Sequence, residues 1–235
     1  MEKVKIQPQS GLGDLVNALP LIEYLDGAEV ATNYAEALAP FQNVEVVPVE
    51  FNGIKPILRD GFRHLKYRKY SEGGFRDEYF PFEGFEIYAN IVRERYRAFY
   101  RREEVGHDFV VFAPPRAAAR HKNKGSFECA PDVDLAYEYV RSLDMPVFLV
   151  GNNDLYPDHI PKAGRDVFDL RDETTFPELC WLIMSAERVV SQVSAITTLA
   201  GLFGTPTKFL KAASETIEEH EKHVAGVVWP GQGVI

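Results

Sequence analysis

Cysteine is scarce in this chain of 235 residues, which carries only Cys129 and Cys180. Two cysteines so far apart cannot build a disulfide framework, and their spacing is not that of a metal site. Long hydrophobic runs are also missing, because no stretch approaches the roughly 20 apolar residues that span a bilayer. The first eight residues lack the apolar core of a secretory signal. We therefore expect a cytoplasmic protein without a transmembrane segment.

An excess of positive charge is missing too. The net charge is −9, which argues against a protein dedicated to nucleic-acid binding. The charge is unevenly distributed, because residues 1–124 hold 18 Lys and Arg against 18 Asp and Glu, whereas residues 125–235 hold 8 against 17. A chain with 46% hydrophobic residues and this length has room for two domains of about 110 residues each. Their different charge characters suggest two lobes with different partners.

Segments with strand and helix spacing alternate along most of the chain. The pattern predicts strands at 4–7, 29–32, 44–49, 109–113, 146–151, 167–170, 188–191 and 207–210. It predicts helices at 15–25, 34–38, 87–102, 132–143, 176–185 and 195–203, and it leaves the rest of 51–105 unplaced. Such alternation is typical of an α/β fold with doubly wound, mostly parallel sheets. We predict an N-terminal domain at 1–105 and a C-terminal domain at 106–235.

A glycine-rich turn with an acid, Ser10-Gly11-Leu12-Gly13-Asp14, follows the first predicted strand. Gly11 and Gly13 allow a sharp turn and a close approach of the backbone to a donor ligand. Open α/β sheets place their sites at the carboxyl ends of the strands, so Asp14 is a candidate general base. The alternative is that Asp14 only caps the following helix.

Two further segments of the second half have the composition of phosphate sites. Ser194, Thr197 and Thr198 open a predicted helix, where free backbone N–H groups favour a phosphate or diphosphate. The alternative is an ordinary serine cap. Directly after the strand at 109–113, a basic loop carries Arg116, Arg120, Lys122 and Lys124. A basic loop at the end of a strand is a candidate phosphate contact, although most basic loops are solvated surface.

Cations and aromatic residues are interleaved at 63–70 and 93–102, where nine Lys and Arg are found. Such stretches stack on bases or grip phosphates. The candidate acceptor contacts are Arg63, Lys66, Arg95 and Arg97. The alternative is a solvated helix face with ion pairs one turn apart.

At this point the sequence resembles a family. Residues 3–49, with Gly11-Leu12-Gly13-Asp14 and then Ala18-Leu19-Pro20-Leu21-Ile22, resemble the opening of the lipopolysaccharide heptosyltransferases, glycosyltransferase family nine. Residues 109–151 and 167–210 resemble the second lobe of that family, with Asp169-Leu170, Val189-Val190-Ser191 and the run 199–206. The chain looks like a shortened member, of the type found in phages, and residues 51–105 are unmatched.

The resemblance implies a GT-B fold, in which two Rossmann-like lobes face a cleft. It implies that Asp14 is the base, that Lys122 or Lys124 contacts the donor phosphates, and that the second lobe binds the donor. The family's acidic run before the donor helix reads Val193-Ser194-Ala195-Ile196-Thr197-Thr198 here. Because its acid, glycine and histidine are replaced by Val193, Ala195 and Thr198, the resemblance does not specify the donor sugar.

The expected function is therefore metal-independent transfer of a sugar from a nucleotide-diphosphate sugar, with no bound cofactor, to an acceptor hydroxyl. The acceptor is a glycan, a lipid-linked sugar or a hydroxymethylated base in DNA. The basic-aromatic stretches favour a polyanionic acceptor. A different alternative is a protein that binds or hydrolyses nucleotide sugars and has lost transfer, which the altered run at 193–198 favours.

Overall fold

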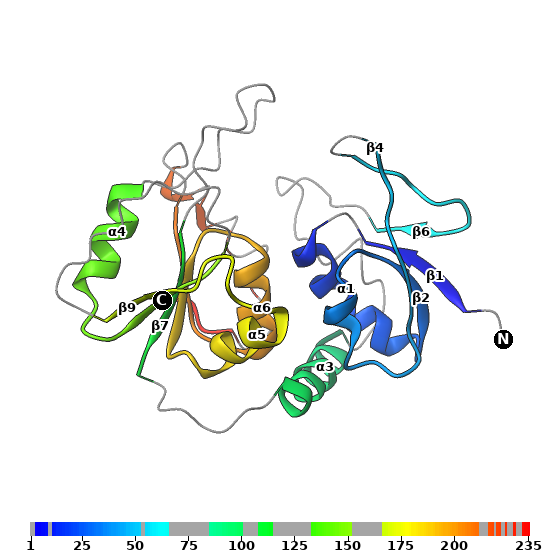
Figure 1. Cartoon of the computed structure of the whole chain (residues 1–235), viewed down its shortest axis with the longest axis horizontal. Helices are drawn as coiled ribbons and strands as arrows, with labels where there is room; N and C mark the ends of the chain where they lie inside the picture. The colour runs from blue at the N-terminus through cyan, green and yellow to red at the C-terminus, as the bar shows by residue number, and fades with distance from the viewer. Residues whose placement is uncertain are drawn as a thin grey trace. The chain divides into compact units, whose positions relative to one another are not determined.

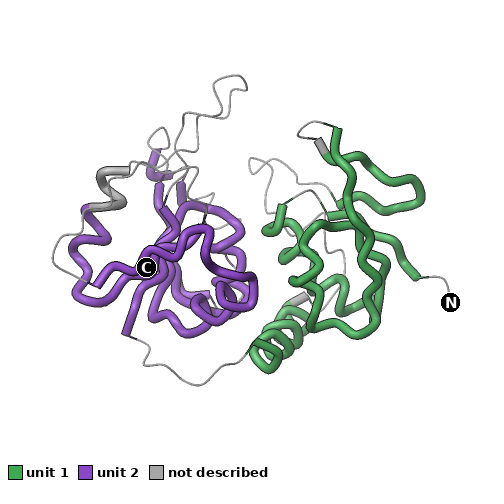
Figure 2. The backbone as a smooth tube through the Cα atoms, in the orientation of Figure 1, with its two compact units in different colours: residues 1–101 green, residues 102–235 purple. Residues whose placement is uncertain are grey.

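A computed structural model of the chain describes residues 3–8, 11–52, 55–65, 85–100, 108–114, 133–151, 166–211, 216–218, 220–221, 224, 228 and 232–235. The chain divides into two compact units, unit 1 at residues 1–101 and unit 2 at residues 102–235 (Figure 2). The sequence places the boundary after residue 105. Within the described ranges, no helix combines the length and apolar character needed to cross a membrane.

Unit 1 contains a parallel sheet with the strand order β3-β2-β1-β6 and a small antiparallel hairpin of β4 and β5. Helices α1 and α3 pack against each other beside this sheet (Figure 1). The strands are β1 (Val4–Gln7), β2 (Ala28–Ala31), β3 (Glu45–Val47), β4 (Phe51–Asn52), β5 (Lys55–Pro56) and β6 (Arg63–His64). The helices are α1 (Leu12–Tyr24), the 3₁₀ helix η1 (Ala35–Leu38) and α3 (Phe85–Tyr100).

Residues of β1, β2 and α1 contribute to the core of unit 1. Ile6 of β1 and its register partner Val30 of β2 are both fully buried. In α1 the buried residues include Leu15, Leu19 and Ile22, which recur every three or four positions and therefore lie on one face. Helix α1 is enclosed on most of its surface, because its buried residues also include Val16, Ala18, Pro20 and Leu21.

A glycine is required in the turn between α1 and β2. Gly27 has a φ of 124°, which side-chain-bearing residues rarely adopt. A Cβ added at Gly27 would also lie 2.9 Å from the carbonyl oxygen of Asn43. This position therefore needs glycine both for its backbone conformation and for space.

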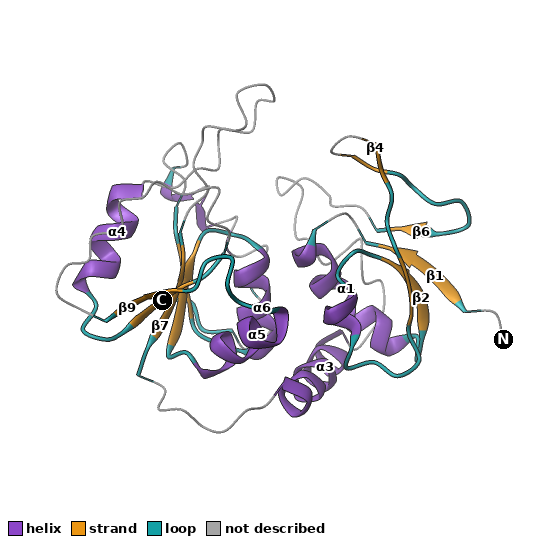
Figure 3. Cartoon of the chain, in the orientation of Figure 1, coloured by secondary structure: helices purple, strands orange, loops and turns teal. Residues whose placement is uncertain are grey.

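Unit 2 contains a five-stranded parallel sheet with the order β11-β10-β7-β8-β9. Helix α4 lies on one side of the sheet, and α5 and α6 lie on the other (Figure 3). The strands are β7 (Val110–Ala113), β8 (Val147–Leu149), β9 (Val167–Asp169), β10 (Arg188–Ser191) and β11 (Thr207–Phe209). The helices are α4 (Val133–Ser142), α5 (Phe176–Ser185) and α6 (Ala195–Phe203).

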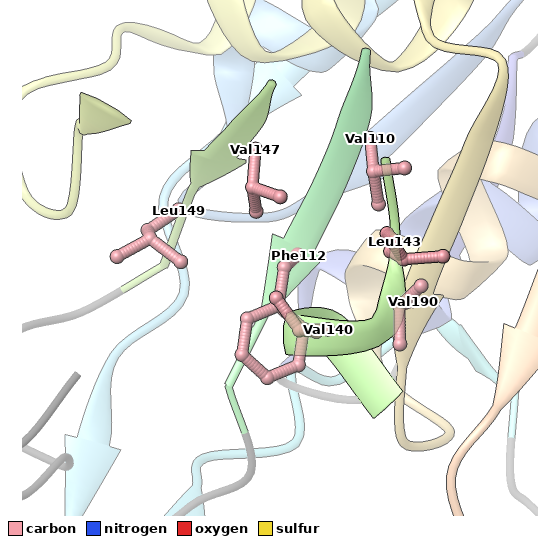
Figure 4. Packing of buried hydrophobic residues seen from close by; sticks show 7 residues of the cluster. All are labelled: Val110, Phe112, Val140, Leu143, Val147, Leu149 and Val190. Atoms are coloured by element: carbon pink, nitrogen blue, oxygen red, sulfur yellow. The ribbon is translucent and has the colours of Figure 1, made fainter. Parts of the chain in front are cut away.

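The core between α4 and the sheet of unit 2 is formed by aliphatic residues and one phenylalanine. Figure 4 shows Val110 and Phe112 of β7 beside residues of α4, β8 and β10. Phe112 is fully buried, and Val190 brings the neighbouring strand into the same cluster. This close packing fixes the sheet of unit 2, and the loops that follow its strands start from that sheet.

The segment 232–235 runs along β11 on the side that faces away from β10. Thr207 donates its N–H to the carbonyl of Gly233 and accepts the N–H of Ile235 at its own carbonyl. The bridge between Thr207 and Val234 is parallel. The buried Gln232 side chain adds a hydrogen bond of 2.8 Å from Nε2 to Thr207 Oγ1. This edge is therefore paired within the chain instead of being open to another strand.

The α/β class with parallel sheets, predicted from the sequence, is confirmed. The predicted helix at 176–185 and strand at 188–191 agree with α5 and β10 to the residue. Three strands of the unplaced segment, β4, β5 and β6, were missed, and β6 joins the main sheet of unit 1.

Candidate active site

Each sheet has one point where the strand order reverses direction. In unit 1 this point lies between β1 and β6, and in unit 2 it lies between β7 and β10. Loops that leave adjacent strands at such a point diverge to opposite sides, which opens a crevice at the carboxyl ends of the strands. Asp14 follows β1, and the hydroxyl residues of α6 follow β10. The two strongest sequence candidates therefore lie where this class of sheet binds its ligands.

Asp14 lies in the first turn of α1 and is only 8% exposed. Its Oδ2 accepts a hydrogen bond of 2.9 Å from the backbone N–H of Gly11, the residue that caps the helix. An acid in a first turn is also favoured by the helix dipole. The capping role expected as an alternative is therefore observed, and the role as a general base stays a prediction.

Gly11 and Gly13 were predicted to contact the donor, and in the structure both form hydrogen bonds within the chain. The Gly11 N–H, which a phosphate would need, donates to Asp14. Gly13 lies within α1, and its carbonyl accepts a hydrogen bond of 2.8 Å from Asn17 Nδ2. Donor binding by Gly11 and Gly13 stays a prediction, and Ser10 lies outside the described residues.

A buried amide at the end of β1 escaped the sequence analysis. Gln7 donates from Nε2 to the carbonyl of Ile57 and accepts the N–H of Arg59 at Oε1, both at 3.0 Å. Its carbonyl also accepts the N–H of Leu65. Gln7 thus fixes the segment that enters β6, and with it the exposed Arg63, whose register partner is Ile6. A polar residue directly after a buried apolar one at a strand end is the only sequence signal for this role.

The three hydroxyl residues at the start of α6 are not equivalent. Thr197 Oγ1 accepts the N–H of Ser194 and donates to its carbonyl, each at 2.9 Å. Thr198 Oγ1 donates to the same carbonyl at 2.9 Å. Ser194 is partly exposed, and its hydroxyl makes a long contact of 3.4 Å with Ser191 Oγ. Of the three, Ser194 therefore has the hydroxyl group best able to turn toward a phosphate.

The strand that precedes the basic loop, β7, lies beside β10, the strand that leads into α6. Ala113, the last residue of β7, is the register partner of Ser191, the last residue of β10. The predicted phosphate contacts Arg116, Lys122 and Lys124 lie outside the described residues, as does the predicted acceptor contact Lys66. Their proposed roles stay predictions.

Two of the predicted acceptor contacts are paired with acids of unit 1. Arg95 Nη2 lies 2.7 Å from Glu23 Oε1 of α1. Arg97 Nη1 lies 3.1 Å from Glu94 Oε1, one helical turn away on α3. The guanidinium of Arg93 is partly buried near Arg97, and burial lowers its pKa. The alternative of a helix face with ion pairs is therefore observed, while acceptor binding by Arg95 and Arg97 stays a prediction.

A further arginine–carboxylate pair lies at the end of β9. Arg171 donates from Nε and Nη2 to the two carboxylate oxygens of Asp169, at 2.7 and 2.5 Å. These hydrogen bonds lower the pKa of Asp169. Within the described ranges, no group of three or more His, Cys, Asp and Glu side chains is arranged to hold a metal ion.

No family model matches the sequence, and no curated protein sequence matches it significantly. Solved structures do match. The E. coli heptosyltransferase WaaC with ADP is similar over 95% of this chain and 97% of its own chain, with 10% identity and a TM-score of 0.55. The E. coli ADP-heptose heptosyltransferase II is similar over 100% of this chain and 90% of its own, with 12% identity and a TM-score of 0.54. The chain has the heptosyltransferase fold.

The α/β fold class expected from the family resemblance is thereby confirmed, and the arrangement of two lobes around a cleft stays a prediction. A family 9 glycosyltransferase from Veillonella parvula also matches, with 10% identity and a TM-score of 0.52. TibC of E. coli, described as an iron-containing dodecameric glycosyltransferase, matches with 15% identity and a TM-score of 0.50. This chain spans 58% of the length of TibC.

Proposed function

We propose that this protein is a glycosyltransferase that uses a nucleotide-diphosphate sugar. The observation that carries the proposal is the pairing of the heptosyltransferase fold with chemically suitable side chains at both reversal points. Asp14 is the acid after β1, and Ser194 with the first turn of α6 is the phosphate-binding candidate after β10. Both are expected positions for ligand contacts in open α/β sheets.

In the proposed reaction, unit 2 binds the donor diphosphate. The N-terminus of α6 offers N–H groups without intrahelical acceptors and the positive end of the helix dipole. Ser194 adds a hydroxyl donor, and Lys122 and Lys124 add positive charge. Such donors stabilise the negative charge that develops on the leaving diphosphate. They would make transfer metal-independent, with no cofactor.

Unit 1 supplies the base and binds the acceptor. The Asp14 carboxylate takes the proton of the acceptor hydroxyl. The acceptor oxygen attacks the anomeric carbon of the donor sugar at the same time. The bond from that carbon to the diphosphate oxygen breaks, and the nucleoside diphosphate leaves with the electron pair. A positioned base typically contributes about 10²–10⁴-fold to the rate. The exposed Arg63 on β6 is the acceptor contact that the geometry of unit 1 favours.

A nucleotide-sugar panel tests this proposal. The protein is mixed with ADP-, GDP-, UDP- and dTDP-sugars, and release of the nucleoside diphosphate is measured with and without acceptors. The acceptors are a phosphorylated lipopolysaccharide core, a lipid-linked sugar and DNA with a hydroxymethylated base. We expect release that requires one acceptor and persists in EDTA. Release that is abolished by EDTA would contradict metal independence.

One observation favours a second function. Val193 occupies the position of the family's acid before α6, so a donor contact expected from the resemblance is missing. A protein that binds or hydrolyses nucleotide sugars without transfer is compatible with this change. Release of nucleoside diphosphate without any acceptor indicates a hydrolase, and binding without release indicates a binding protein.

A further inference from the structure

The backbone conformation does not explain why residue 11, in the loop after β1, is a glycine. Gly11 has a φ of −96° and a ψ of 153°, an extended conformation that any residue adopts. The reason lies in the neighbouring carboxylate. A Cβ added at Gly11 would lie 3.1 Å from Asp14 Oδ2 and 3.7 Å from Asp14 Cγ. The first distance is shorter than ordinary van der Waals contact, so a side chain at position 11 would displace the carboxylate.

The same residue also holds that carboxylate. The Gly11 N–H donates to Asp14 Oδ2 at 2.9 Å, an ordinary distance for an N–H···O hydrogen bond. Asp14 is only 8% exposed, so water contributes little to its orientation. Gly11 therefore affects Asp14 in two ways. Its backbone N–H forms a hydrogen bond with the carboxylate, and its lack of a side chain leaves space for that carboxylate.

We propose that Gly11 is a positioning residue for Asp14, which orients its carboxylate toward the acceptor hydroxyl. This inference rests on the proposed function, in which Asp14 is the base. It gives Gly11 a role different from the predicted donor contact, which stays a prediction. Bases work only at a near-attack geometry, and a misplacement of about 1 Å lowers rates by about 10²-fold. A displacement of a few tenths of an ångström is expected to lower kcat by about 10-fold.

The variant Gly11→Ala tests this role, because it keeps the N–H and adds only the Cβ. Its matched control is Asn17→Ala, which removes a hydrogen bond to Gly13 in the same part of α1 and leaves the Gly11 N–H and the space at position 11 unchanged. The first readout is ¹³C NMR of the aspartate carboxyl groups, with the Asp14 signal assigned by its loss in Asp14→Asn. We expect the Asp14 signal to move in Gly11→Ala and to stay in place in Asn17→Ala.

The second readout separates positioning from donor binding. We expect Gly11→Ala to lower kcat about 10-fold while the donor KM and the calorimetric Kd values of ADP, GDP and UDP stay unchanged. We also expect Gly11→Ala to have no further effect in an Asp14→Asn background, because it acts through that carboxylate. An unmoved Asp14 signal, or a weakened nucleoside diphosphate Kd with an unchanged kcat, would overturn the inference.

Failure of the proposed function looks different. If Asp14→Asn keeps the wild-type turnover, Asp14 is not the base, whatever Gly11→Ala does to its signal. If Asp14→Asn is inactive and Gly11→Ala is normal in both readouts, the base is supported and the positioning role is wrong.

Discussion

Arg95 of α3 forms an ion pair with Glu23 of α1, with 2.7 Å between Nη2 and Oε1. The Arg95 guanidinium also lies over the ring of Phe41, 5.4 Å from its centroid. The Glu23 side chain is 14% exposed and that of Arg95 is 37% exposed. A residue predicted from its sequence context to contact an acceptor therefore connects two helices and a loop of its own unit.

Replacing Arg95 by Ala is expected to lower the free energy of unfolding by roughly 1–2 kcal/mol, because an ion pair and a cation–π contact are lost together. The matched control is Arg97→Ala, whose pair with Glu94 is exposed and is worth about 0.3–0.5 kcal/mol. Urea unfolding of the two variants gives the comparison. Equal stability with a raised acceptor KM would instead favour the acceptor role.

Replacing Asp14 by Asn is expected to reduce transfer at least about 100-fold, the low end for a lost general base. The amide oxygen still accepts a hydrogen bond from the Gly11 N–H, so α1 keeps its cap and the fold is preserved. Steady-state kinetics and circular dichroism check the two parts of the prediction. Turnover at the wild-type level would leave Asp14 as a cap alone.

Replacing Thr197 by Ala is expected to destabilise unit 2 by about 1 kcal/mol, the usual effect of losing a cap. Its Oγ1 is the acceptor of the Ser194 N–H, and the residue is 3% exposed. Thr197→Ser keeps the oxygen and should restore most of the stability. Ser194→Ala should change thermal stability little and weaken nucleoside diphosphate binding instead. The opposite pattern, with Thr197 governing binding, would contradict the division of roles at α6.

Replacing Gly27 by Ala is expected to destabilise the protein by more than about 1 kcal/mol, because strain at positive φ and a collision with Asn43 act together. Gly61 is the matched control. Its φ is 78°, but nothing lies within 4 Å of an added Cβ, so Gly61→Ala tests the conformational strain alone. In chemical denaturation, Gly27→Ala should therefore have a lower free energy of unfolding than Gly61→Ala.

The Asp169–Arg171 pair predicts a pH dependence of stability. The hydrogen bonds from Arg171 lower the pKa of Asp169 below its ordinary value of 3.8. A carboxyl group with a lowered folded-state pKa contributes stability above its unfolded pKa, and this contribution is lost as the pH falls through the folded pKa. Asp169→Asn should therefore be less stable than wild type at pH 7, and the difference should shrink below about pH 4. A difference that is constant from pH 7 to pH 3 would contradict this.

The sequence predicted those helices and strands whose burial produces a distinctive spacing of apolar residues. The strand at 188–191 and the helix at 195–203 were predicted correctly because a buried parallel strand and an amphipathic helix each have a distinctive apolar spacing. Strand β6 was missed because Arg63 and His64 carry no apolar alternation. Its place in the sheet depends on the Gln7 side chain and carbonyl, which are contacts across 50 residues or more.

The candidate site was predictable in position and not in detail. The loop after β1 and the start of α6 were found because glycine, acid and hydroxyl residues directly follow strands. The sequence did not distinguish Ser194 from Thr197, because both are hydroxyl residues on the same turn and only the hydrogen bonds separate them. Nor did it separate Arg95 from Arg97, since Glu23 lies 72 residues away along the chain.

The pairing of segment 232–235 with β11 determines an order of folding during synthesis. All strands of the unit 1 sheet lie between residues 4 and 64, so that sheet can form while the ribosome is still translating unit 2. The edge of β11 becomes paired later, because segment 232–235 follows helices α4, α5 and α6 along the chain. Until segment 232–235 has been synthesised, the edge of β11 lacks this partner, and an unpaired strand edge favours aggregation.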